Sequence, residues 1–358
     1  MVTRFTLCCQ IALLLFTCLP CAADISCLNE EGNPVDWFVI YKLPKYKLDE
    51  VGSGVEYMYL DESVARWQMS KYMINSSQGA IANTLNQLYM GKAYMANSSV
   101  YVLYNDGPPD LKYIQAYGHT KGVLLFDRAQ GFWLSHSIPH FPSFPERGYI
   151  YPSSGKLNGQ TMLCMTYQYA QFLKIAQQLE YLYPRFYNCS VPTAFSADLP
   201  QLAKLCEGSK PALASDKNMQ PLVSSQGEKF TSFVKSKHFV EDIYTGWVAQ
   251  VLDADLLVES WQTQGHDLPS NCSLPRHTMN IKRIRLPTSV RFRSYFDHSK
   301  WCVSQAYEDQ VTCLGDLNRE WAQKWRGGGL ICSYNPVIYK AFRQLVEWYI
   351  SCRMTGHD

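Results

Sequence analysis

A histidine and a lysine separated by one position occur twice in this chain, and this repeat constrains the fold more than any other feature. His119 and Lys121 stand in GHTKGVLLFD, and His298 and Lys300 stand in DHSKWCVSQ. Residues two apart in a strand point to the same face, so each pair presents an imidazole and an ammonium group together. The copies lie 179 residues apart (298 minus 119), slightly more than half of the chain that follows its N-terminal leader. This spacing is typical of a duplicated half-unit.

The sequence that follows each pair also matches. HTKGVLLFD continues through a polar turn into GFWLSHS, and HSKWCVS continues through residues 305–310 into VTCLGDLN. Short runs of β-branched and aromatic residues around a polar turn predict a β-hairpin. Two such hairpins related by a pseudo-two-fold axis would bring both histidines and both lysines to one seam. A single His-x-Lys is most often a solvated strand end, but a repeat with matching context is hard to obtain by chance.

These residue types fit the cleavage of a phosphodiester bond. Neutral imidazole can attack phosphorus and form a phosphohistidine. A second imidazole, protonated, can supply the proton for the leaving oxygen, and lysines can hold the non-bridging oxygens as fixed charges. Asn318, at the end of the second hairpin, can donate its amide to the same oxygens. This scheme requires no metal ion and no other cofactor.

Residues 1–23 are predicted to be a secretory signal peptide. One cation, Arg4, precedes the apolar run Leu7–Leu19, and small residues precede a cleavage position after Ala23. The apolar run is too short to cross a bilayer, and no later window offers about 18 uninterrupted apolar residues. We therefore expect a chain that enters the secretory pathway and has no membrane span.

The cysteines and glycosylation motifs agree with entry into the secretory pathway. Nine of the 13 cysteines follow the signal peptide, and this odd number leaves at least one thiol unpaired. The other eight can form up to four disulfides, whose pairing the spacing alone leaves open. Four Asn-x-Ser motifs predict a surface glycoprotein, and they begin at Asn75, Asn97, Asn188 and Asn271.

The net charge is close to zero, so this is not a strongly basic protein. Without Arg4 the chain has 32 basic and 31 acidic residues, or +1 with histidine neutral. Protonation of all eight histidines would raise this charge to +9. Attraction to a polyanion is therefore expected to depend on acid.

The sequence predicts a mixture of strands and helices, and it contains no low-complexity linker. Four runs have strand character, and these are Trp37–Leu43, Val100–Asn105, Lys121–Asp127 and Gly131–Ser137. Ala170–Tyr183 and Ile338–Ile350 have apolar residues at helical spacing. The polar stretch Glu207–Gly227 is the best candidate for a junction. An α/β or α+β fold with sheets covered by helices is expected.

Several other motifs favour structural roles. His136 and His140 in SHSIPH invite a zinc site, but Pro139 disrupts a helical i, i+4 display, so no metal is expected there. The remaining histidines have no partner at ligand spacing and are predicted to lie at the surface; they are His238, His266, His277 and His357. The run Arg326–Gly329 lacks the ending of a phosphate loop and favours a tight turn.

Segments along nearly the whole chain resemble the deoxyribonuclease II family, part of the phospholipase D superfamily with its two His-x-Lys repeats. These segments are VDWFVIYKLP, YLDES, YNDGPP, GHTKG, GFWLSHSIPHFP, LPSNCSLP, DHSKWCVS, CLGDLNR and RGGGLIC. The stretches ISCLNEEG and SNCSLP are more similar to the beta type of the family than to its alpha type. The resemblance implies a phospholipase D-like α/β fold, with two packed α/β half-units related by pseudo-two-fold symmetry. We place these half-units at 24–206 and 228–358, with residues 207–227 as a possible junction loop.

The resemblance also implies an acid endonuclease that cuts DNA without divalent metal and leaves 3′-phosphate and 5′-hydroxyl ends, in lysosomes or after secretion. The residues that match the family motif are His119, Lys121, His298, Lys300 and Asn318. Analogy with the superfamily assigns His119 as the nucleophile and His298 as the general acid. Two alternatives stay open, a phosphodiesterase of the superfamily with another substrate and a non-catalytic secreted DNA-binding glycoprotein. The oligomeric state, monomer or homodimer, is also open.

The family's disulfide pattern implies three pairs, Cys27–Cys164, Cys272–Cys352 and Cys313–Cys332. Cys189 with Cys206 is a plausible fourth pair, which leaves Cys302. Its thiol either lies near the site, on the face of His298 and Lys300, or is buried and inert, and the buried alternative is favoured.

The chain also departs from the superfamily pattern. The acid expected five residues after the first motif lysine is Phe126, and Asp127 follows one position later. Ser135 and Ser137 stand where the second half has glycine and asparagine. The two halves are therefore expected to contribute unequally to the site.

Overall fold

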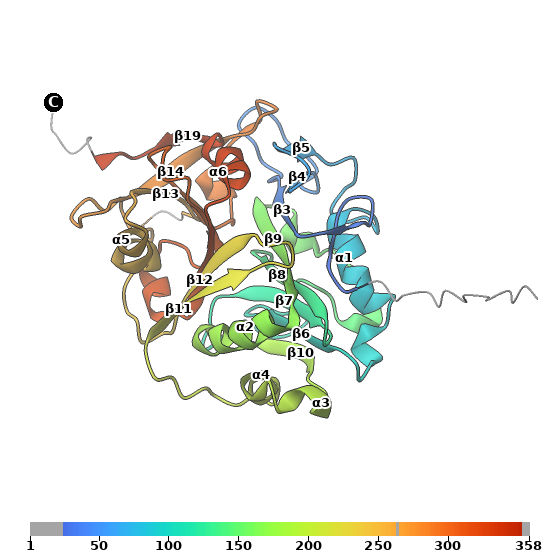
Figure 1. The fold of residues 1–358 in the computed structure, drawn as a ribbon. Helices are drawn as coiled ribbons and strands as arrows, with labels where there is room; N and C mark the ends of the chain where they lie inside the picture. The colour runs from blue at the N-terminus through green and yellow to red at the C-terminus, as the bar shows by residue number, and fades with distance from the viewer. Residues whose placement is uncertain (1–23, 263–264, 353–358) are drawn as a thin grey trace, which may run out of the picture.

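The computed structural model describes residues 24–262 and 265–352, and the fold is drawn in Figure 1. The predicted signal peptide and His357 lie outside the described residues. Two large sheets dominate the molecule, beside the small pair β1 (Cys27–Leu28) and β2 (Pro34–Val35). The mixed α/β fold expected from the sequence is thereby confirmed.

The first sheet has the order β10-β6-β7-β8-β9-β3-β4-β5. Its strands are β3 Trp37–Lys42, β4 Tyr57–Asp61, β5 Gln68–Met69, β6 Val100–Asn105, β7 Lys121–Phe126, β8 Gln130–His136, β9 Gln160–Gln168 and β10 Phe186–Ser190. All of its neighbouring strands are antiparallel.

The second sheet has the order β11-β12-β18-β17-β16-β13-β14-β15, and β19 pairs with β14. Its strands are β11 Lys217–Val223, β12 Lys229–Lys235, β13 Leu256–Glu259, β14 Thr278–Arg285, β15 Arg291–Arg293, β16 Trp301–Ser304, β17 Thr312–Gly315, β18 Gly328–Ser333 and β19 Val346–Tyr349. Only β13 and β14 run parallel to each other.

The central strands of each sheet are buried on both faces, which explains why these strands read as nearly continuous apolar runs. Along β3, Trp37, Val39 and Tyr41 lie in a core that the two sheets share, whereas Phe38 and Ile40 lie in a second core. Side chains alternate across a strand, so a run such as WFVIYK supplies two cores at once. The second sheet has its own outer core as well.

Helices cover these cores (Figure 1). Helix α2 (Tyr169–Leu182) contacts strands of both sheets and contributes to the shared core, as α6 (Pro336–Arg343) does. Helix α1 (Ala80–Tyr89) packs in the outer core of the first sheet. The π-helical turn η4 (Tyr244–Val248) and α5 (Ala249–Leu252) pack in that of the second. The short helices α3 (Thr193–Ser196) and α4 (Pro200–Cys206) follow β10.

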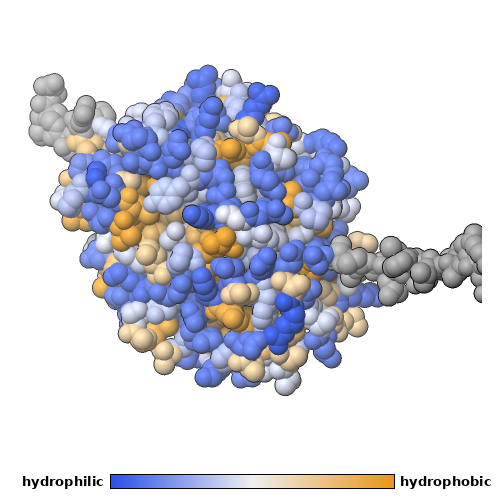
Figure 2. Space-filling view, in the orientation of Figure 1, coloured by the Kyte–Doolittle hydropathy of each residue, from blue (hydrophilic) through white to orange (hydrophobic). Residues whose placement is uncertain are grey.

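Short 3-10 helices occupy several connections. They are η1 Ala93–Met95, η2 Pro145–Arg147, η3 Ser153–Gly155, η5 Ser294–Phe296 and η6 Trp321–Trp325. Within the described part of the chain, no helix is long and apolar enough to span a membrane. On the face in Figure 2, hydrophilic residues predominate and hydrophobic patches are scattered among them.

The expected strands and the helix near 170–183 are present, but the helix predicted at Ile338–Ile350 is wrong in its second half. Helix α6 begins after Asn335, whose side chain accepts hydrogen bonds from two backbone N–H groups of the first turn, and it ends at Arg343. Residues 346–349 form β19, which pairs with the edge of β14. Tertiary pairing with that edge overrides the helical spacing, and the β-branched and aromatic residues of VEWY favour a strand.

The segment 207–227 is partly ordered strand, because it contains β11, which pairs with β12. The chain passes from the first sheet to the second between Cys206, the last residue of α4, and Lys217, the first residue of β11.

The described residues form four disulfides. Three are the pairs that the family resemblance implies, Cys27–Cys164, Cys272–Cys352 and Cys313–Cys332, and the fourth is the plausible additional pair, Cys189–Cys206. Cys302 is free and fully buried in the outer core of the second sheet. Burial raises the pKa of its thiol, which keeps the group protonated and unreactive.

Candidate active site

Both His-x-Lys pairs open β-hairpins, as their context predicts. His119 and Lys121 lead into the antiparallel pair β7 and β8, and His298 and Lys300 lead into β16 and β17. All four side chains line one pocket of about 310 Å³, and Asn318 lines it too. The structure therefore brings together every residue that the sequence nominated for catalysis.

A reciprocal pair of backbone hydrogen bonds holds the two histidines in place. The N–H of His119 donates to the carbonyl of Gly327, just before β18, and the N–H of His298 donates to that of Gly159, just before β9, each at 2.8 Å. A Cβ at Gly327 would lie 2.5 Å from the carbonyl oxygen of Leu182, and at Gly159 it would lie 2.5 Å from a carboxylate oxygen. Glycine is needed at both positions because the segments approach so closely.

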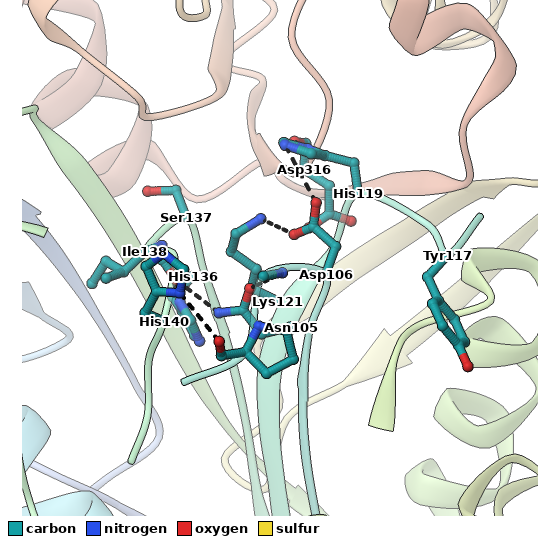
Figure 3. A network of polar contacts seen from close by, with 12 residues as sticks. Asn105, Asp106, Tyr117, His119, Lys121, His136, Ser137, Ile138, His140 and Asp316 are labelled. Atoms are coloured by element: carbon teal, nitrogen blue, oxygen red, sulfur yellow. Dashed lines mark hydrogen bonds and ion pairs between the residues drawn. The ribbon is translucent and has the colours of Figure 1, made fainter. Parts of the chain in front are cut away.

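His119 has a defined orientation. Its Nδ1 lies 2.7 Å from the backbone carbonyl oxygen of Asp316, an acceptor, so Nδ1 carries the proton. Its Nε2 therefore has the lone pair, and it lies 3.9 Å from a carboxylate oxygen of Asp106 (Figure 3). Burial and the charge of Lys121 hold the pKa of His119 well below its ordinary value. The ring is thus a neutral imidazole with a free nitrogen.

Asp106 is the anionic centre of the pocket and follows β6 directly. It forms an ion pair with Lys121 (Figure 3). Its other oxygen lies 3.2 Å from a guanidinium nitrogen of Arg326. Burial alone would raise the pKa of Asp106, but its cationic neighbours hold the pKa well below its ordinary value. The carboxylate thus stays ionised in acid and neutralises part of the positive charge around it.

The surroundings of His298 differ from those of His119. Its ring packs on Trp261 with centroids 4.2 Å apart, and its Nε2 is buried without a hydrogen-bond partner among the residues that the structure describes. Burial, together with the charges of Lys300 and Lys121, lowers the pKa of His298 to about 3. An anion in the pocket would offset those charges and raise this pKa.

Lys300 and Asn318 complete the polar lining. Burial and the charge of Lys121 lower the pKa of Lys300 to about 7, and its Nζ donates to the carbonyl of His298 at 2.5 Å. The Asn318 side-chain oxygen accepts from the N–H of Trp261 at 3.1 Å, so the NH₂ group of this amide is the end left to donate to a ligand.

A buried network behind the site fixes the second hairpin. Tyr41, from β3 of the first sheet, donates to a carboxylate oxygen of Asp297, and the N–H of Ser299 donates to the other oxygen at 3.0 Å. Burial and the neighbouring carboxylate of Asp297 raise the pKa of Glu259 well above its ordinary value. Burial likewise raises the pKa of Asp297. The first sheet thereby positions His298, which the second half of the chain carries.

Other nominated residues have structural positions. Asp127 bonds two backbone N–H groups in the turn between β7 and β8 and lies outside the pocket lining. His136 is buried and accepts the N–H of Ile138, while His140, whose Nδ1 lies 3.1 Å from a carbonyl oxygen, lines the pocket. Ser137 lines it as well, and its hydroxyl bonds Gln160 at 2.5 Å.

The remaining predictions concern the surface. Asn75 and Asn97 are exposed, whereas Asn188 and Asn271 are half-buried. The predicted surface histidines that the structure describes are exposed or half-buried. They are His238, His266 and His277.

Sequence reasoning missed several lining residues. Asp106 stands in the YNDGPP segment, and Trp261, Tyr113 and Gln323 have no motif around them. Arg326 was expected only in a turn, yet its guanidinium contacts Asp106. The signal that marks Asp106 is an acidic residue directly after a buried strand, and it gains meaning only when the neighbouring strand is known to begin at Lys121.

Comparison with known proteins shows which class of protein carries this pocket. A family model for Deoxyribonuclease II matches residues 26–352. Deoxyribonuclease-2-beta of Homo sapiens is 47% identical over 335 residues, which cover 93% of this chain and 93% of that protein. Deoxyribonuclease-2-alpha of Sus scrofa is 39% identical, over 92% and 91% of the two chains. Plancitoxin-1 of Acanthaster planci is 37% identical, over 92% of each chain.

The fold and the pocket therefore define a hydrolase of the nuclease class. The chain belongs to the deoxyribonuclease II family. The expected similarity to the beta type is also confirmed, because relatives named beta are 45 to 47% identical and those named alpha are 37 to 39% identical.

Proposed function

We propose that this enzyme is an acid endonuclease that hydrolyses DNA phosphodiester bonds without a divalent metal, through a phosphohistidine, and leaves 3′-phosphate and 5′-hydroxyl ends. The observation that carries the proposal is the meeting of two histidines, two lysines and Asn318 in one pocket. Two ammonium groups in that pocket supply the positive charge that a metal ion supplies in other nucleases.

In the first step, the Nε2 lone pair of His119 attacks phosphorus. A nitrogen–phosphorus bond forms while the bond from phosphorus to the 5′-oxygen breaks, and the His298 imidazolium gives its proton to that oxygen. The 3′-linked strand remains on His119 as a phosphoramidate. Lys121 and Lys300 hold the non-bridging oxygens, and the carbonyl that binds Nδ1 of His119 stabilises the charge that develops on the ring.

In the second step, water attacks the phosphorus. Neutral His298 accepts a proton from this water, the nitrogen–phosphorus bond breaks, and His119 leaves as neutral imidazole. The product has a 3′-phosphate, and His298 is again protonated for the next turnover. Each residue thus returns to its starting state.

The acid requirement follows from His298. Its pKa of about 3 in the unliganded pocket means that few molecules carry the proton near neutral pH. A bound phosphodiester raises the pKa by offsetting the lysine charges, but kcat/KM reports the free enzyme and should fall as the pH rises. His119 must instead be a neutral imidazole to attack phosphorus, and its lowered pKa keeps it neutral in acid.

We further propose that the two halves of the chain, 24–206 and 228–358, are packed half-units of the phospholipase D type. The strand series β6-β7-β8-β9-β3 and β13-β16-β17-β18-β12 correspond, and all four neighbouring pairs in each series are antiparallel. The reciprocal bonds to Gly159 and Gly327, each the residue before a corresponding strand, support the same pseudo-two-fold relation.

The proposed setting is the lysosome or the exterior of the cell, reached through a signal peptide at 1–23. The four disulfides agree with an oxidising compartment. Glycans are proposed at Asn75, Asn97, Asn188 and Asn271.

Two substrates test the roles of the histidines separately. With plasmid DNA in EDTA at about pH 5, both His119→Ala and His298→Ala should abolish nicking. With bis(p-nitrophenyl) phosphate, whose leaving group needs no proton, His298→Ala should keep much of its activity in the first step and His119→Ala should keep none.

His238→Ala is the matched control, because this histidine is exposed and lies outside the pocket lining. Full nicking by either active-site variant would refute the assignment. Cleavage of phospholipid vesicles in preference to DNA would favour a lipid phosphodiesterase of the superfamily.

A further inference from the structure

Four arginines lie on one face of the antiparallel pair β14 and β15. The register places Arg283 opposite Arg293 and Arg285 opposite Arg291. Directly opposed residues, and residues two apart on a strand, share a face of the sheet. The residue pair between them is fully buried on the other side. We call these four residues the arginine ladder.

The ladder holds more positive charge than its neighbours neutralise. Glu347 lies 3.7 Å from Arg283 and 3.8 Å from Arg291, and Asp49 lies 3.1 Å from Arg291. Arg285 and Arg293 are exposed, and neither guanidinium has an ion pair or hydrogen bond within residues 24–262 and 265–352. Like charges that face each other across strands destabilise a sheet, so this arrangement favours an anionic ligand.

An open cavity of about 550 Å³ adjoins the ladder and combines cations with aromatic rings. Arg283 and Arg293 line it, together with the residues Tyr295 and Trp348, which are 53% and 47% exposed. Trp348 lies opposite Arg283 across the β14–β19 pair, two strands that are side by side in Figure 1. Guanidinium groups beside exposed rings suit a ligand with phosphates and bases.

The cavity lies next to the catalytic pocket. Trp261 lines the catalytic pocket and connects it to the cavity, because its ring packs on His298 and its Nε1 donates to the carbonyl of Tyr295, a residue that lines the cavity, at 3.0 Å. The next residue, Gln262, lines the ladder cavity. Along the chain, Arg293 precedes His298 by only five positions. A strand held at the catalytic pocket can thus continue over the ladder.

We propose that the arginine ladder and its cavity form a second DNA-binding site, which holds the substrate strand beyond the scissile phosphate. Arg285 and Arg293 bind backbone phosphates, and Tyr295 and Trp348 stack against bases that are unpaired there. Arginine suits this task because its planar guanidinium group binds phosphate with two hydrogen bonds. This inference rests on the proposed function, and it adds where and by which groups the substrate is held.

The test compares DNA with a small phosphodiester. In Arg285→Gln/Arg293→Gln, the KM for DNA should rise, and the slope of log affinity against log salt should become shallower by about 2 over roughly 50 to 200 mM salt, because about two phosphate contacts are lost. Turnover of bis(p-nitrophenyl) phosphate should equal that of the unaltered enzyme. Lys92→Gln/Lys340→Gln removes the same charge from two exposed lysines outside both cavities and should change neither substrate's kinetics.

The outcomes separate the two proposals. If the unaltered enzyme cuts DNA and the ladder variant has the same KM and salt slope, the inference is overturned while the proposed function stands. An equal loss in the lysine control would overturn it too, because the effect would then be one of net charge. Loss of heparin binding with unchanged DNA kinetics would assign the ladder to a sulfated polysaccharide instead. If the unaltered enzyme does not cut DNA, the proposed function itself fails.

Discussion

Replacement of Asp106 by asparagine tests the electrostatic design of the pocket. The change keeps the shape of the side chain and removes its charge, which leaves Lys121 and Arg326 buried beside a neutral amide. The Asp106 side chain is only 4% exposed, so solvent screens this loss little. Removal of one partner from a buried ion pair costs about 3 to 5 kcal/mol. At about 2 °C per kcal/mol, the lower end for a chain of this length, Tm should fall by about 6 to 10 °C.

Phosphate should reverse part of this loss, because it can take the place of the missing carboxylate between the cations. If the variant binds inorganic phosphate about tenfold more tightly than the unaltered enzyme does, saturating phosphate adds about 1.4 kcal/mol more to its stability. The measurement is Tm by differential scanning fluorimetry across a phosphate titration. Asp110→Asn is the control, because its ion pair with Arg147 is exposed and contributes at most about 1 kcal/mol.

The stability difference should also depend on pH with a definite sign. The pKa of Asp106 is lowered in the folded protein, so its contribution is complete above the unfolded value of about 3.9 and disappears as the pH falls through the folded value. The gap between the two proteins should thus be constant from about pH 5 to 7 and shrink below about pH 4. Equal Tm values without phosphate, or equal stabilisation of both proteins by phosphate, would show that the Asp106 carboxylate does not balance the buried cations.

Three further predictions concern single residues. Lys42→Met should move the falling limb of the kcat/KM profile to higher pH, because the Lys42 charge helps to lower the pKa of His298; a uniform loss at every pH would contradict this. Gly327→Ala should reduce kcat by about 100-fold, because a Cβ 2.5 Å from a backbone carbonyl displaces the segment that holds His119; unchanged kcat would contradict a positioning role for the hydrogen bond between Gly327 and His119. Cys302 should resist iodoacetamide in the native protein and react after denaturation, as mass spectrometry of the peptides would record.

The sequence predicted well that the two His-x-Lys pairs lie together, because their signal is local. The i, i+2 spacing within each His-x-Lys pair and the polar turns after them depend only on strand geometry, and both hairpins are present. The duplication then predicted that the pairs meet, and the lining of one pocket by all four side chains agrees with that prediction.

The remaining parts of the site depend on contacts between distant segments, which periodicity does not report. Asp106 gains its role from Arg326, 220 positions away, and Tyr41 from a carboxylate 256 positions away. The strand β19 was missed for the same reason, because its partner β14 stands far earlier in the chain. Side chains with ordinary local surroundings, such as Trp261, become part of the pocket only when the fold places a histidine against them.

The most direct test of the central claim is to trap the covalent intermediate. A short DNA substrate is mixed with excess enzyme at about pH 5 in EDTA, the reaction is quenched in base, where phosphohistidine survives, and the peptides are read by mass spectrometry. The phosphohistidine mechanism predicts a 3′-linked nucleotide on His119, and this adduct should disappear in His119→Ala. An adduct on His298, or single-turnover cleavage by His119→Ala, would contradict it.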